Sequence, residues 1–128
     1  MNKKECAEYV CGFCENGVEL LRRHMEDYDG EILLHIFVPD MVYFPLRECI
    51  KSKDEAGVKK YCGCIERLWK EGDDEVWNTV DVSVLECLTD NDDIWQAFGK
   101  FISVDFKNYI NNEYIPEKSR LLKINKLG

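Results

Sequence analysis

The sequence predicts an all-α protein of five to six helices, arranged as an antiparallel bundle or a short stack of helical hairpins. Three observations support this class. Apolar residues recur at three- and four-residue steps through most of the chain. Short polar breaks at 29–30, 72–74, 89–92 and Pro116 divide the chain into helix-sized pieces. No hairpin signal joins two alternating runs, so a strand would have no partner.

The first third of the chain predicts one helix and one ambiguous segment. Apolar positions at helical spacing mark the N-terminal helix, which is weakened by two glycines; they are Val10, Phe13, Cys14, Leu20, Leu21, Met25 and Tyr28. The run from Glu31 to Val38 fits a buried strand or a buried helix. Pro39 and Pro45 disfavour one unbroken helix through Ile50. We therefore interpret 31–50 as a broken helix that restarts near Pro39.

Three more helices are expected in the remainder. The first runs from about Asp54 to Lys70, and Gly72 is placed to end it as a C′ residue. The next starts at Asp73 or Asp74 and carries an apolar stripe to Leu88. The clearest runs from about Asp92 to about Asn111, and Asp90, Asn91 or Asp92 can cap its first N–H groups.

Composition indicates a single helical domain spanning residues 1–128. The chain is 45% hydrophobic and 12% aromatic, which supplies one core and excludes a disordered class. Acidic residues interrupt any leader-like segment at the N-terminus, and no apolar run approaches the roughly 20 residues that span a bilayer. We therefore expect a cytoplasmic protein that does not bind a membrane.

The 7 cysteines indicate reduced, buried thiols rather than a disulfide framework, because the count is odd and no signal peptide is visible. Cys11 and Cys14 form C-x-x-C, and Cys62 and Cys64 form C-x-C, so four thiolates for zinc are the alternative. Residues two apart on a helix do not face each other, which argues against that site. We expect no metal and no cofactor.

No catalytic constellation is visible in the sequence. A nucleophilic Cys or Ser needs a nearby base, and only His24 and His35 are available. His24 lies near a helix end, and His35 lies within an apolar run. No nucleophile elbow, P-loop, zinc-protease or dinucleotide motif occurs. The sequence therefore favours a protein that is not an enzyme.

The net charge of −8 is concentrated in one segment. From Glu71 to Gly99 there are nine acids and no Lys or Arg, which leaves 16 acids and 17 bases in the rest of the chain. Binding to nucleic acid derives its affinity from Lys and Arg on phosphates, so this balance argues against it. An acidic surface suits a basic protein partner.

This acidic window supplies the candidate partner-binding residues, with one tryptophan beside them as an aromatic anchor. They are Asp73, Asp74, Glu75, Trp77, Asp81, Glu86, Asp90, Asp92 and Asp93. An alternative reading is structural: acids at helix starts cap and complement the helix dipole, and Trp77 and Trp95 lie on apolar stripes that would face a core. That reading does not explain the missing Lys and Arg at helix C-termini.

The central block resembles small, acidic, helical immunity proteins found beside bacterial contact-dependent growth-inhibition and other polymorphic toxins. The likeness lies in LLHIFVPDMVYFPL, then YCGCIERLWKEGDDEVWNTVDVSVLECL and the acidic turn, and covers roughly residues 30 to 112. The resemblance implies a protein that binds its cognate toxin domain, often a nuclease with a basic cleft, and blocks it. A helical adaptor that has no toxin partner is the alternative.

Overall fold

The computed structural model describes the backbone of residues 1–127 and the side chains of residues 1–123. Those residues form seven continuous helices and contain no strand, which confirms the all-α class and corrects the expected count of five to six. The helices run through these segments: α1 (Lys3–Cys11), α2 (Gly17–Asp27), α3–η1–α4 (Leu34–Val38, Pro39–Tyr43, Phe44–Lys51), α5 (Glu55–Glu71), α6–η2–α7 (Asp74–Thr79, Val80–Val84, Leu85–Asp90), α8 (Asp92–Gly99) and α9–η3–α10 (Val104–Tyr109, Ile110–Tyr114, Ile115–Leu127).

Three of the helices contain a π turn, and two of these turns explain why proline does not break the chain. The turn η1 immediately precedes Phe44-Pro45, and η3 immediately precedes Ile115-Pro116. A proline ring clashes with the carbonyl four residues earlier and cannot donate a hydrogen bond. The wider π turn relieves that conflict, so the helix continues. The expected breaks near Pro39 and at Pro116 were wrong, and the ambiguous run after Glu31 is helical from Leu34.

The prediction of a single N-terminal helix was also wrong, because two helices occupy that region. α1 begins with a capping box in which Asn2 and Glu5 bond each other's backbone N–H groups. A turn follows, and α2 starts at Gly17. A Cβ at Gly17 would lie 2.0 Å from the Cys11 carbonyl oxygen. Only glycine permits this close approach, so α2 turns back against α1 instead of extending it.

The helix expected from Asp92 to Asn111 is divided into two. α8 ends at Gly99, and Ser103 caps α9 by accepting a hydrogen bond from the Phe106 N–H at 3.2 Å. The Ser103 N–H donates to a Glu66 carboxylate oxygen at 2.6 Å, which fixes the break against α5. The apolar stripe continues across the break because both helices face the same core.

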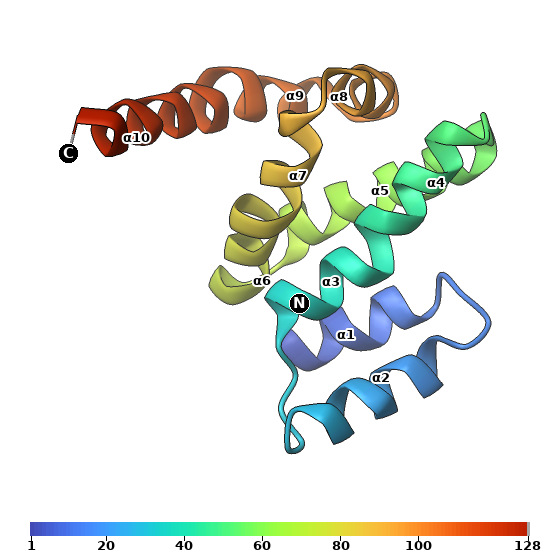
Figure 1. The fold of residues 1–128 in the computed structure, drawn as a ribbon. Coiled ribbons are helices and arrows are strands. Elements are labelled where there is room, and N and C mark those ends of the chain that lie inside the picture. Colours follow the sequence, from blue (N-terminus) through green and yellow to red (C-terminus); the bar gives the residue numbers. More distant parts are fainter. Residues whose placement is uncertain (128) are drawn as a thin grey trace.

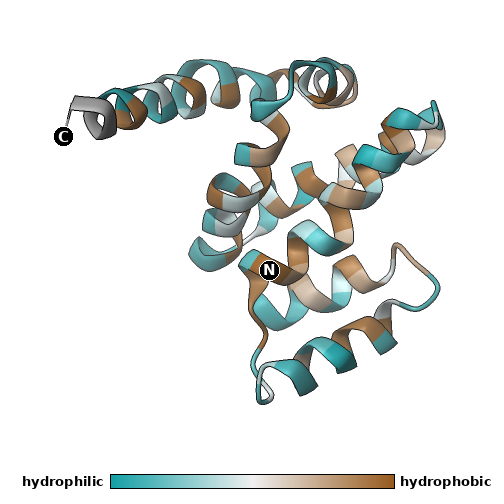
Figure 2. Ribbon diagram, viewed as in Figure 1, coloured by the Kyte–Doolittle hydropathy of each residue, from teal (hydrophilic) through white to brown (hydrophobic). Residues whose placement is uncertain are grey.

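The core lies where α1, α3, α5 and α6–η2–α7 meet. Figure 1 shows α1 and α2 as an antiparallel pair, crossed by the long α3–η1–α4 helix, with α5 returning beside α4. Apolar residues gather on the inward sides of these helices (Figure 2). The largest fully buried side chains include Phe98, Phe106, Leu46, Ile65 and Leu68. These rings and aliphatic chains hold the second half of the chain on α5.

Gly72 sets the corner between α5 and α6. Its φ of −69° and ψ of 145° are open to any residue, so the left-handed C′ geometry expected for it is absent. A Cβ at this position would instead lie 2.5 Å from the Leu68 oxygen and 2.5 Å from Val76 Cγ1. Close packing, rather than backbone torsion, therefore requires glycine at the corner.

The C-terminal helix leaves the body of the molecule. In Figure 1 α10 extends to the upper left, away from α1 and α2 and beyond α6 and α7. Within residues 1–127, no helix combines the length and the apolar character needed to cross a membrane.

Candidate functional site: an acidic groove between two helices

The structure divides the predicted acidic window among three places. Asp73, Asp74 and Glu75 lie at the start of α6, whereas Asp92 and Asp93 lie in the first turn of α8. The remaining three acids, Asp81, Glu86 and Asp90, follow the helix between those ends. The acids of the window therefore lie on two helices and at both ends of the first of them.

The acids at the start of α6 have structural partners. The Asp73 side chain caps the helix by accepting from the Val76 N–H at 3.0 Å, and its own N–H donates to the Met1 oxygen at 2.7 Å. Glu75 pairs with Lys3 at 3.8 Å. Asp74 is exposed. This cluster joins the N-terminus to α6, and Asp73 has a structural role as the cap of that helix.

Asp92 and Asp93 are exposed in the first turn of α8. Asn91 provides the cap of this helix, because its side-chain oxygen accepts from the Ile94 N–H at 3.1 Å. Two carboxylates beside the positive end of the helix dipole favour the helix. Trp95 is partly buried against Phe98, with ring centroids 6.1 Å apart, which fits the core role rather than an anchor.

Asp81, Glu86 and Trp77 line a groove of about 470 Å³ between α6–η2–α7 and η3–α10. Residues from the C-terminal helix complete it, and none of them was among the predicted site residues. The full lining is Trp77, Asp81, Val82, Glu86, Tyr109, Glu113, Tyr114, Glu117, Lys118, Leu121 and Leu122. This volume falls within the size range of sites that hold a ligand or a partner side chain.

Aromatic rings form one wall of the groove. Trp77 and Tyr109 meet edge to face, with centroids 5.7 Å apart and planes 65° apart. Behind them Trp69 packs on Tyr109 at 5.4 Å and stacks on Phe106 at 4.6 Å. The Tyr109 hydroxyl donates to an Asp81 carboxylate oxygen at 2.5 Å. This wall is anchored in the core and is therefore held in one geometry before any partner arrives.

Apolar side chains line the groove but remain open to solvent. Val82 is 47% exposed, Leu121 is 48% exposed and Leu122 is 51% exposed. They come from the two helices that form the groove, so the surface continues across it. Together they give the groove an apolar lining that is accessible to solvent.

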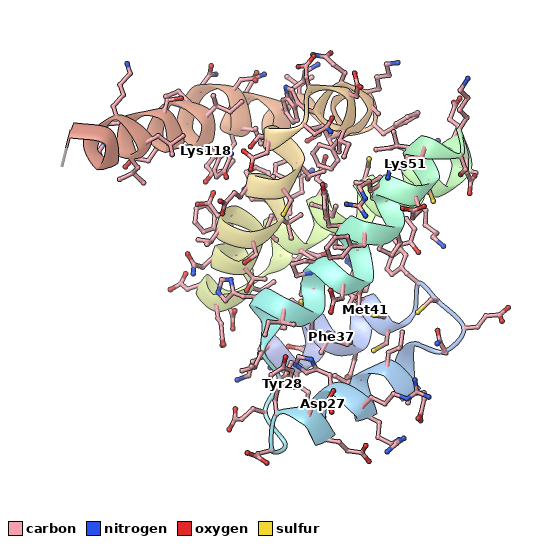
Figure 3. The ribbon with its side chains drawn as sticks, viewed as in Figure 1. Asp27, Tyr28, Phe37, Met41, Lys51 and Lys118 are labelled. Carbon is pink, nitrogen blue, oxygen red and sulfur yellow. The ribbon has the colours of Figure 1, made fainter. Side chains whose placement is uncertain are left out.

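Carboxylates outnumber cations around the groove. Asp81, Glu86, Glu113 and Glu117 line it, and Lys118 is its one cation among the side chains described. Lys118 lies on α10 (Figure 3), and its ammonium donates to Asp90 at 2.5 Å, Thr89 Oγ1 at 3.2 Å and the Glu86 carbonyl oxygen at 3.4 Å on α7. The groove therefore retains a negative field.

Two tyrosines of the groove, Tyr109 and Tyr114, have raised pKa values. Burial, the hydrogen bond to Asp81 and the Asp81 charge raise the pKa of Tyr109 above its usual value. Burial raises the pKa of Tyr114 to about 12, and the charges of Asp81, Glu86 and Asp90 act in the same direction, against a hydrogen bond to Thr89. Both hydroxyls are neutral donors at pH 7, so the negative charge in the groove comes from carboxylates.

Sequence reasoning missed Tyr109, Glu113, Tyr114 and Glu117 as site residues. The expected helix ended near Asn111, and Pro116 was read as a break, so the C-terminal segment was separated from the acidic window. The signal that could have joined them is the four-residue spacing of Tyr109, Glu113 and Glu117, which places them along one side of a helix once the chain continues through the proline.

The cysteines are free thiols, and of the four in the paired motifs only Cys14 is partly exposed. Cys62 and Cys64 lie in the interior of α5, and Cys11 is buried at the end of α1. Burial raises the pKa of Cys62 to about 12 and that of Cys64 to about 12, so both are neutral at pH 7. Among the described residues, no three His, Cys, Asp or Glu side chains are grouped to hold a metal ion.

Each of the two histidines forms a hydrogen bond to a residue of another segment. His24 is buried between Tyr28 and Phe37, and its Nε2 accepts a hydrogen bond from the Leu33 N–H at 2.9 Å. An Nε2 that accepts a hydrogen bond carries no proton of its own. His35 Nδ1 and Ser83 Oγ lie 2.6 Å apart and join α3 to η2.

Comparison with known proteins gives a family. Residues 7–116 match the family described as "Domain of unknown function (DUF7674)", and the chain belongs to that family. The match includes most of the groove and ends just before Glu117 and Lys118. No curated protein and no solved structure matches the chain.

Proposed function

We propose that the protein binds one basic protein partner through the acidic groove, and that this partner is a toxin domain which the contact neutralises. The observation that carries the proposal is the groove itself: exposed apolar side chains, an aromatic wall anchored in the core, and an excess of carboxylates. A binding role, rather than catalysis, is the function we assign to these residues.

The chemistry of the groove suits a protein better than the other ligand classes. Nucleic acid would be repelled by four carboxylates around the site. Apolar side chains with an aromatic anchor and a polar rim form the usual anatomy of a protein interface. We propose that the seven helices act as a short stack of helical hairpins that holds the two groove walls in place.

The toxin assignment rests on the sequence resemblance to immunity proteins and on electrostatics. A nuclease cleft is basic, and an acidic partner competes with its substrate and speeds association. We propose that the protein acts in the cytoplasm, where a toxin and its inhibitor would meet before the toxin is exported. The second candidate is a helical adaptor without a toxin partner, which the same groove would serve.

The test is capture with tagged protein from the source cell at low salt, followed by elution with rising salt. Immunity predicts that one basic domain elutes, that it is toxic when expressed alone, and that co-expression of this chain restores growth. A captured domain that is not toxic would favour the adaptor. Capture that does not weaken with salt would contradict the acidic groove as the binding site.

A further inference from the structure

The lining of the groove suits one face of a helix. Its two walls are helical, α6–η2–α7 on one side and α9–η3–α10 on the other, and both contribute exposed apolar residues, Val82 from one and Leu121 and Leu122 from the other. A helix that docks between two others presents apolar residues at three- and four-residue spacing to such a surface.

Lys118 shows what kind of charge the groove accepts. Its side chain crosses from α10 to α7 and binds one carboxylate, one hydroxyl and one carbonyl oxygen at the end of that helix. Lys118 forms an ion pair with Asp90, and Glu117 forms an ion pair with Arg120 at 2.5 Å. Glu86 and Glu113 have no ion-pair partner among the side chains that the structure describes. These two carboxylates are therefore open to a cation from a partner.

The aromatic wall selects the type of cation. Trp77 presents its ring beside Tyr109, and both lie in the groove with Asp81 and Glu86. A guanidinium is planar, weakly hydrated and able to stack on a ring while it donates to a carboxylate in its plane. An ammonium is more strongly hydrated and lacks the plane. The combination of ring and carboxylate therefore favours arginine over lysine.

We propose that the occupant of the groove is an amphipathic helix of the partner protein, with an arginine on Trp77, cationic residues facing Glu86 and Glu113, and leucine-like side chains on Val82, Leu121 and Leu122. This inference rests on the proposed function, because it names the segment of the basic partner that the groove receives. Charge disfavours a second copy of the chain, since each copy carries a net charge of −8.

The experiment uses the full chain and three capped peptides of about 14 residues that differ only at the cationic positions. Leucines at helical spacing form one face of each peptide, and the flanking positions carry arginine, lysine or citrulline. Citrulline keeps the shape of arginine without its charge. Binding is measured by calorimetry at low salt and at physiological salt, and size-exclusion chromatography reports the oligomeric state.

Two variants of the groove and one matched control complete the design. Trp77→Leu removes the ring, and Glu86→Gln with Glu113→Gln removes two charges. Glu8→Gln with Glu15→Gln removes two charges from exposed acids outside the groove, so the net charge changes equally. Circular dichroism confirms that each variant is folded before its binding is compared.

We expect the arginine peptide to bind at least about tenfold more tightly than the citrulline peptide and more tightly than the lysine peptide. Either groove variant should lose about tenfold or more in affinity, and the control should lose less than about threefold. Equal binding of the arginine and citrulline peptides would overturn the proposal, as would no binding of the arginine peptide or equal losses in groove and control variants.

Two further results separate this inference from the proposed function. A toxin domain that is bound and neutralised equally well by Trp77→Leu and by the two groove carboxylate substitutions would overturn the groove occupant and leave immunity standing. A dimer of the free chain that these substitutions dissociate would show that a second copy fills the groove, which would also overturn the proposal.

Discussion

Raising the pH above 9 should destabilise the protein through three buried thiols. Cys6, Cys62 and Cys64 are at most 1% exposed. Burial raises the pKa of each from its ordinary 9.0 to about 12. In the unfolded chain these thiols lose their protons near pH 9, whereas in the folded protein they keep them. The unfolded state therefore binds fewer protons between pH 9 and about 12, and the free energy of unfolding falls as the pH rises.

The size of the effect follows from the ordinary thiol pKa. Between pH 9 and pH 10 each thiol that stays protonated only in the folded state lowers the free energy of unfolding by about 1 kcal/mol, so three thiols lower it by about 3 kcal/mol. Tyr109 and Tyr114 act in the same direction at higher pH, because burial raises the pKa of each. Below pH 8 the thiols are protonated in both the folded and the unfolded state, so they cause no loss of stability there.

Urea denaturation at pH 8, 9 and 10 with a reductant measures this loss. Cys64→Ala provides the check, because its stability should fall by about 1 kcal/mol less over the same range, whatever its stability at pH 8. A free energy of unfolding that stays level from pH 8 to pH 10 would refute the reasoning. It would mean that the thiols are exposed or already ionised, as they would be in a thiolate metal site.

Three other substitutions test the fold that carries the groove, each by urea denaturation at pH 7. Gly72→Ala should cost about 1–3 kcal/mol, because its Cβ overlaps the Leu68 oxygen; an unchanged stability would show that the corner is loose. Phe106→Ala should cost about 3–5 kcal/mol, since the ring is fully buried under Trp69; a loss below 1 kcal/mol would contradict that packing. His24→Leu should cost about 1–3 kcal/mol by leaving the Leu33 N–H without its acceptor, and a neutral result would show that water replaces it.

The sequence predicted the parts of the fold that depend on local patterns. The helix after Asp54 was found because its apolar stripe and its cap both lie within the segment. The helix breaks at Gly17 and Ser103 were missed, because each depends on a contact with another segment: the Cys11 carbonyl in one case and the Glu66 carboxylate in the other. Periodicity continues through such breaks when both pieces face one core.

The site was predicted only in part for the same reason. Charge alone identified Asp81 and Glu86, and it added Asp73, which caps α6. It could not find Tyr109 or Glu113, because they belong to a different segment, which lies beside the acidic helix only in the folded chain. A charge count describes a segment, whereas a groove is made by two segments that meet in space.

The most direct test of the central claim compares three sets of charge substitutions for binding of the captured basic domain. Glu86→Gln with Glu113→Gln alters the groove, Asp92→Asn with Asp93→Asn alters the start of α8, and Glu8→Gln with Glu15→Gln is the control. The account predicts that only the groove substitutions weaken binding by about tenfold or more and abolish protection from the toxin. Full binding by the groove variant, or an equal loss in all three, would contradict it.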